Sequence, residues 1–264
     1  MSQTQAAPQI TGTMFLFQKP ELLTKEQHSG LGLKRADKPF GFCAAVRAIP
    51  LTLSEITTAG KHYPVVFSGA ENPVPLAVVG LFEDVNVYVS ETGEWEPEAY
   101  VPGYIRRYPF AFASESSGDR LALVIDTAYA GIGEGGEFPL FDNGQLSTTT
   151  QNAMEFCRQY EQDRRGTDEL MKRLQALNLV VGQSAQYTRP GATEPQVFAQ
   201  YFGIDETALN NLTDEKFIEL RRSNLLPIIY SQLMSMGNWR QVLSRRARRY
   251  KLEGDAILQP IRAN

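Results

Sequence analysis

The sequence predicts an α+β protein with a strand-rich N-terminal half and a helical C-terminal half. Between about residues 14 and 140, short apolar runs alternate with glycine and proline, as in strands joined by turns. Farther along the chain, apolar residues recur at helical spacing. Because strands precede helices instead of alternating with them, we expect an antiparallel or mixed sheet packed with the helices around a shared core.

The expected domain organisation follows from the same pattern. Residues 1–13 are small and polar, without periodicity, and are predicted to form a disordered arm. We expect a single domain over residues 14–250 and a tail over residues 251–264. A chain of 264 residues is long enough to bury one large core without a disulfide or metal.

The strand-rich half contains four predicted strands and one predicted helix. In residues 85–89, valines alternate with Asn86 and a tyrosine, which is typical of a half-exposed strand. The helix is expected over residues 51–56, with Thr52 or Ser54 as its N-cap. The predicted strands are residues 64–67, 76–81, 85–89 and 121–125, the last being the final clear strand.

The helical half contains several N-terminal signals. Ser147 is expected to cap a long helix that Gly166 breaks in two. Thr213, followed by two acids, is expected to cap a short helix. Pro227 is typical of a first helical turn, and Asn238 is placed to cap a last helix.

Composition indicates a globular, soluble protein. The two cysteines, Cys43 and Cys157, lie far apart beside apolar neighbours, which favours buried thiols over one disulfide. Residues 1–10 have neither the positive charge nor the apolar run of a secretory signal, so a cytoplasmic location is expected. No apolar run approaches the ~18 residues of a membrane span, because prolines interrupt the most apolar region.

Three sequence features invite a catalytic or metal-binding interpretation. Residues 131–136 match G-x-G-x-x-G, but phenylalanine and proline follow where a phosphate-binding helix should begin, so a turn is favoured. The two histidines, His28 and His62, are isolated from each other, and no metal site is predicted. Asp126 ends a predicted strand, where it is either a site carboxylate or, more commonly, a turn cap. No hydrolase or P-loop signature is present, and no cofactor is expected.

The segment of residues 100–110 has an unusual composition. Two adjacent arginines are flanked by three tyrosines and two prolines. Guanidinium groups bind carboxylates or phosphates bidentately and stack on aromatic rings, so the segment is either an anion-binding site or a structural hub paired with nearby acids. The candidate ligand-binding residues in this segment are Tyr100, Tyr104, Arg106 and Arg107. Asn86, which precedes the segment, is a further candidate.

A basic cluster lies near the C-terminus. Residues 240–251 carry six basic side chains and no acid; the whole chain carries a formal charge of −4, so the remainder carries −10. This asymmetry favours a weak, salt-sensitive contact with an anionic surface, although a solvated helix end is an alternative. Specific nucleic-acid recognition is not expected, since the cluster has one stacking residue. The contact is predicted through Arg245, Arg246, Arg248 and Arg249.

Several blocks along the chain together resemble the SapC family. The most specific is YVPGYIRRYPF at residues 100–110, preceded by HYPVVF at residues 62–67. PLFD at residues 139–142 resembles the family's acidic turn before its long helix, and residues 225–235 resemble its closing helices. The similarity extends over about residues 40–243.

The resemblance implies an association with bacterial surface layers, without an agreed biochemical activity. The genes of relatives also lie near genes for outer-membrane nutrient receptors and halogenase-like proteins. The favoured hypothesis is therefore a non-enzymatic accessory or interaction protein with a protein partner in the cell envelope or surface layer. The alternative is an enzyme or small-molecule-binding protein that uses residues 100–110. The chain departs from the family pattern at Asn224, where glycine is common, and in its basic tail.

Overall fold

The computed structural model describes residues 14–114, 121–188, 191 and 193–261, so the predicted N-terminal arm lies outside the described residues. The chain forms two compact units, each made from two segments. The first unit comprises Met1–Phe42 and Arg106–Gln162, and the second comprises Cys43–Ile105 and Asp163–Asn264. Antiparallel sheets precede most of the helices, which confirms the predicted α+β class.

The first unit contains two three-stranded antiparallel sheets and a two-stranded ribbon, with the short helix α1 (Lys25–His28) between β1 and β2. Its core joins Phe110, Ile125 and Leu140 to Cys157 of the long helix α4 (Thr148–Ala176). The sheets have the orders β1 (Pro20–Leu22), β7 (Leu121–Asp126), β6 (Phe110–Ser114) and β8 (Ile132–Glu134), β2 (Leu31–Leu33), β9 (Phe138–Pro139); the ribbon is β10 (Phe141–Asp142) and β11 (Gln145–Leu146).

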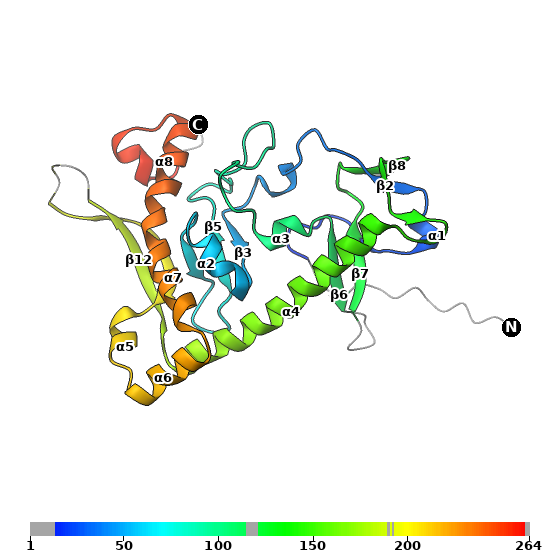
Figure 1. The fold of residues 1–264 in the computed structure, drawn as a ribbon. Helices are drawn as coiled ribbons and strands as arrows, with labels where there is room; N and C mark the ends of the chain where they lie inside the picture. The colour runs from blue at the N-terminus through cyan, green and yellow to red at the C-terminus, as the bar shows by residue number, and fades with distance from the viewer. Residues whose placement is uncertain (1–13, 115–120, 189–190, 192, 262–264) are drawn as a thin grey trace. The chain divides into compact units, whose positions relative to one another are not determined.

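The second unit is built on a five-stranded antiparallel sheet (Figure 1). Its order is β12 (Val180–Tyr187), β13 (Gln196–Ile204), β4 (Val65–Phe67), β5 (Pro75–Val78) and β3 (Ala48–Pro50). The helical elements are η1 (Gly41–Cys43, which begins in the first unit), η2 (Leu53–Glu55), α2 (Ile56–Ala59), α3 (Gly103–Arg106, which ends in the first unit), α5 (Glu206–Asn210), α6 (Asp214–Arg222), α7 (Leu226–Ser235), η3 (Met236–Asn238), α8 (Trp239–Tyr250) and η4 (Gly254–Leu258).

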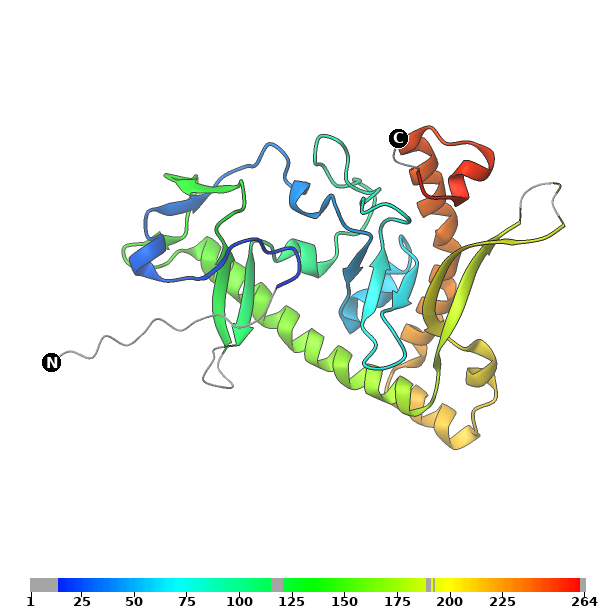
Figure 2. The same ribbon diagram turned by 180° about the vertical axis from the view of Figure 1, so that it is seen from behind.

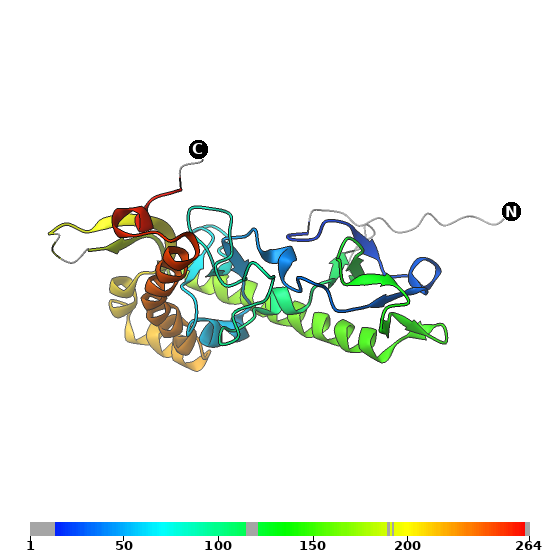
Figure 3. The same cartoon turned by 90° about the horizontal axis from the view of Figure 1, so that it is seen from above.

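Helix α7 packs on the sheet of the second unit through β13 and β4. The core there joins Phe67, Leu174, Ile204 and Ile229. The β12–β13 hairpin lies beside α8 in two opposite views (Figures 1 and 2). Seen from above, η4 lies beside the same hairpin (Figure 3). Hairpin, α8 and η4 therefore form one face of this unit.

Most of the predicted elements are present, although neither Thr213 nor Asn238 makes the side-chain cap hydrogen bond that was expected of it. The backbone N–H of Thr52 and the carboxylate of Glu55 form a capping box at the start of η2. Ser147 Oγ accepts the backbone N–H of Thr150 at 3.2 Å and caps α4. Pro227 lies in the first turn of α7, as predicted. Helix α4 is continuous, however, so the predicted break at Gly166 is wrong. A side chain at position 166 would contact no neighbouring atom, so the lack of one in glycine costs the helix no packing.

Two strand predictions are wrong. Residues 85–89 form turns with a single bridge from Val89 to Trp95, because Asn86 bends the backbone by accepting the N–H of Tyr88. The segment 121–125 is not the last strand, since β12 and β13 are the longest strands and lie in the helical half. Residues 131–136, expected to form a turn, contain the strand β8, which pairs with β2; the next element is the strand β9, not a phosphate-binding helix.

Candidate functional site

The segment 100–110 is anchored by a buried carboxylate in the second unit. Tyr100 Oη donates to Glu55 Oε1 at 2.9 Å, and the same oxygen accepts the backbone N–H of Gly103. Glu55 Oε2 accepts the backbone N–H and the hydroxyl of Thr52 at 3.0 and 2.9 Å. Tyr104, the residue after Gly103, is also buried. Four donors therefore occupy the Glu55 carboxylate, which fixes the start of this segment.

The two arginines of this segment belong to the first unit and lie over aromatic rings of α4. The guanidinium carbon of Arg106 is 5.0 Å from the centroid of Phe156, and that of Arg107 is 4.4 Å from the centroid of Tyr160. Such cation–π contacts are favourable because the ring face is electron-rich. The aromatic partners predicted for a guanidinium are thus present, and they come from the protein itself.

Asn86 has a structural environment in the second unit. Its side chain is fully buried, and Nδ2 donates to the backbone carbonyl of Cys43 at 3.3 Å. Its Oδ1 accepts the N–H of Tyr88 at 2.9 Å, and its backbone carbonyl accepts Arg249 Nη1 at 3.3 Å. Asn86 and the Tyr100–Glu55 pair belong to the second unit, whereas Arg106 and Arg107 belong to the first.

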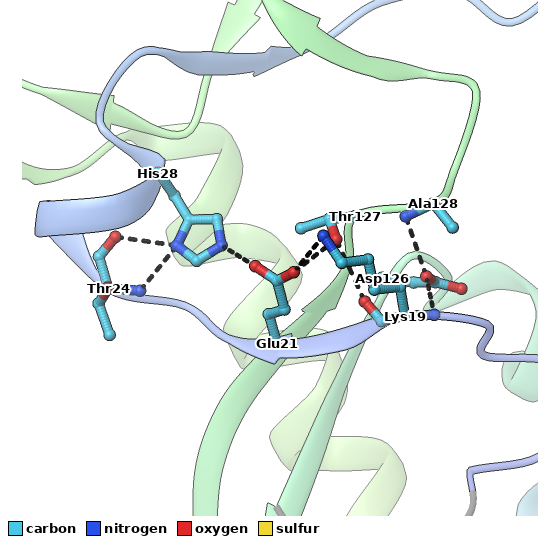
Figure 4. Close-up of polar contacts among 7 residues, drawn as sticks. All are labelled: Lys19, Glu21, Thr24, His28, Asp126, Thr127 and Ala128. Atoms are coloured by element: carbon cyan, nitrogen blue, oxygen red, sulfur yellow. Dashed lines mark hydrogen bonds and ion pairs between the residues drawn. The ribbon is translucent and has the colours of Figure 1, made fainter. Parts of the chain in front are cut away.

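Asp126 is a turn cap in the first unit (Figure 4). Its fully buried carboxylate accepts two backbone N–H groups through Oδ1, from Lys19 at 2.9 Å and Ala128 at 3.1 Å. Its Oδ2 accepts the N–H of Gln18 and the hydroxyl of Tyr108, both at 2.9 Å. Because four donors surround it, this carboxylate joins β7 to the chain before β1, and the turn-cap interpretation is confirmed.

A histidine–carboxylate pair lies close to this cap (Figure 4). His28 is buried; its Nε2 lies 3.4 Å from Glu21 Oε2, and its Nδ1 lies 3.2 Å from the backbone nitrogen and 3.1 Å from the carbonyl oxygen of Thr24. Lys19 Nζ lies 2.8 Å from Glu21 Oε1, and this hydrogen bond is the main reason that the pKa of Glu21 is lowered. The pair fixes α1 against β1. Among the described residues, no group of three His, Cys, Asp or Glu side chains is placed to hold a metal.

Three arginines of the basic cluster make internal contacts in the second unit. Arg246 is fully buried, so its predicted contact with an anionic surface is wrong; it pairs with Glu83 instead. Arg245 Nη1 lies 2.6 Å from Glu96 Oε2 and its guanidinium covers the ring of Tyr88 at 4.5 Å. Arg249 donates to the backbone carbonyl of Val89 at 2.7 Å.

The remaining arginines of α8, Arg240 and Arg248, are exposed and share one stripe of the helix with Ser244. In the described part of the chain, no carboxylate pairs with either. A cavity of about 370 Å³ lies on this stripe, lined by Arg240, Gln241, Ser244, Arg245 and Arg248. Arg248 was predicted as a contact residue, but Arg240 and Ser244 were not grouped with it, although the spacing of four residues from 240 to 248 was a signal for this stripe.

A larger cavity, of about 630 Å³, borders the same stripe. It shares Arg240 and Ser244 with the basic cavity, and Phe198, Trp239 and Leu243 contribute apolar surface. Phe198 and Trp239 meet edge to face with ring centroids 5.7 Å apart. An apolar cavity of this size with a few polar groups at its edge is typical of a ligand site. We call the two cavities together the α8 site.

Comparison with known families identifies the chain. The family model SapC matches residues 23–242. The chain belongs to the SapC family. No curated protein and no solved structure matches it. All the segments quoted for the resemblance lie within the SapC match, whereas Ser244, Arg245 and Arg248 of the α8 site lie beyond its last residue.

None of the helices in the described part of the chain combines the length and apolar character that a bilayer crossing requires.

Proposed function

We propose that this SapC-family protein is a non-enzymatic accessory protein that binds a component of the bacterial cell envelope or surface layer through the α8 site. The observation that carries the proposal is the contrast along α8: Arg245, Arg246 and Arg249 have internal partners, whereas Arg240 and Arg248 are exposed and line the basic cavity, and Arg240 also lines the larger, apolar one. Exposed cations beside an apolar cavity suit recognition of an anionic partner. The family's surface-layer association supports the envelope as its place of action.

The internal contacts of the other polar groups support binding rather than catalysis. The carboxylates of Asp126 and Glu55 each accept four hydrogen bonds. Burial raises the pKa of Cys43 to about 12 and that of Cys157 to about 11, which disfavours the nucleophilic thiolate. An enzyme whose site is formed by residues 100–110 would use side chains that already make structural contacts, which disfavours this alternative.

Fractionation of the source bacterium tests this proposal. We expect tagged wild-type protein to co-sediment with the envelope fraction and to be released by high salt, because exposed ion pairs are screened. The double variant Arg240→Gln/Arg248→Gln should lose most of this association. The control Arg221→Gln/Arg222→Gln removes two exposed charges from α6 and should retain it. Wild-type protein confined to the soluble fraction, or equal recovery of both double variants, contradicts the proposal.

A further inference from the structure

We infer that the α8 site binds a single-chain anionic amphiphile, with its apolar chain in the larger cavity and its acid group on Arg240 and Arg248. This inference rests on the proposed function, because it names the ligand chemistry of the same site. The recognised class is a carboxylate or phosphate monoester attached to an aliphatic chain.

The larger cavity suits an aliphatic chain. Its walls come from the hairpin, α8 and η4, and include Phe198, Trp239, Leu243 and Leu258, each less than a tenth exposed. Because these walls are already largely buried, a chain placed here gains mainly by removing its own apolar surface from water. The volume of about 630 Å³ lies in the range of small-molecule sites.

The basic cavity suits an acid group at the end of that chain. Arg240, Ser244 and Arg248 follow each other at intervals of four residues and so share a face of α8. At 1.5 Å per residue, the two arginines begin about 12 Å apart along the axis, and their long side chains can approach a common oxyanion near Ser244. Guanidinium groups bind carboxylate and phosphate oxygens with short, charge-assisted hydrogen bonds. Arg240 and Ser244 line both cavities. One molecule can therefore place its aliphatic chain in the larger cavity and its acid group in the basic cavity.

Charge also sets the orientation of the ligand. On the η4 side of the larger cavity, Gly254 lies in the wall, and its neighbour Glu253 is an exposed acid. This carboxylate disfavours an anion on that side, whereas Arg240 attracts one on the α8 side. The acid group therefore lies at the α8 end of the cavity.

Calorimetric titration of the full chain with dodecanoate, below the concentration at which it forms micelles, tests the inference. Dodecyl maltoside has the same chain with a neutral head, and acetate has the same head without the chain. We expect one dodecanoate per protein, at least about tenfold weaker binding of dodecyl maltoside, and no measurable binding of acetate. Arg240→Gln/Arg248→Gln should weaken dodecanoate binding about tenfold, while Arg221→Gln/Arg222→Gln should change it less than about twofold.

A second variant separates site binding from adsorption. Ser244→Trp places a large ring where the two cavities meet and should abolish dodecanoate binding, with an unchanged circular dichroism spectrum and melting temperature, because Ser244 is exposed. Equal binding of dodecyl maltoside, or binding that survives Ser244→Trp, overturns the inference. Sedimentation with phosphatidylglycerol vesicles without binding of monomeric dodecanoate also overturns it and assigns the arginines to a membrane surface. If dodecanoate fails to bind while envelope recovery still depends on Arg240 and Arg248, the inference fails and the proposed function stands.

Discussion

The guanidinium of Arg246 lies against the carboxylate of Glu83, with Nη2 2.7 Å from Oε1 and Nε 3.0 Å from Oε2. Arg246 also donates to the backbone carbonyls of Ala256, Ile257 and Gln259, at 3.2, 2.8 and 2.8 Å. One buried side chain thus fixes α8, η4 and the segment around Glu83 together. The wall of the α8 site that η4 supplies depends on this arginine.

Replacement of Arg246 by methionine is expected to destabilise the second unit by about 3 kcal/mol, because Glu83 and three carbonyls lose a donor that water replaces poorly. Chemical denaturation monitored by tryptophan fluorescence measures this loss, since Trp239 lies on α8. The matched control is Arg248→Met on the same helix, which should change the free energy of unfolding by less than about 0.5 kcal/mol. Equal stability of the two variants contradicts the assigned role of Arg246.

The Arg246–Glu83 pair also predicts a pH dependence of stability. Burial raises the pKa of Glu83, but hydrogen bonds from Arg246 and from the N–H of Ile261 outweigh it, and the net pKa lies below the ordinary value of 4.5. A carboxyl whose folded pKa is lowered contributes stability that is complete above its unfolded pKa and is lost as pH falls through its folded pKa. We therefore expect the difference in stability between wild type and Glu83→Gln to shrink below about pH 4.5. A difference that stays constant between pH 7 and pH 3 is incompatible with this pairing.

Asp126→Asn is expected to destabilise the first unit by about 3 kcal/mol, because an amide nitrogen would face backbone N–H donors in a buried site. Tyr108→Phe removes one of the four donors and should cost about 1 kcal/mol. Thermal melts of both variants give these values. If Asp126→Asn melts like wild type, the carboxylate is not a structural cap, and a chemical role for it returns.

Arg107→Lys is expected to lower stability by about 1 kcal/mol, because an ammonium group cannot stack on Tyr160 as a planar guanidinium does. Arg106→Lys should behave similarly through Phe156. Melting temperatures, together with recovery of a captured envelope partner, distinguish a hub from a site. Variants that melt like wild type and keep their partner show that the arginines of residues 100–110 serve neither role.

The local sequence determined much of the secondary structure and the family. Thr52 with Glu55 and Ser147 mark helix starts through contacts within a few residues, and Thr213 and Pro227 mark them by their positions at the N-cap and in the first turn, so these elements were predictable. The same holds for strands β4 and β5, whose apolar runs are bounded by turn residues. The family follows from blocks spread along the chain, and the model match over residues 23–242 rests on the same linear information.

Tertiary structure decided what depends on distant partners. The basic run at residues 240–251 suggests a solvated surface, but Arg246 is buried because Glu83 and the carbonyls of η4 replace its water. Asn86 bends a stretch whose valines alternate as in a strand, since its amide bonds to the carbonyl of Cys43. Strand β13 joins the sheet by pairing with β4, where Phe202 lies opposite Phe67 from the other half of the chain. A polar group that is buried or paired loses its contacts with water and gains contacts with residues far along the chain. The free energy of this exchange depends on those residues, so it is set only when the fold brings them together.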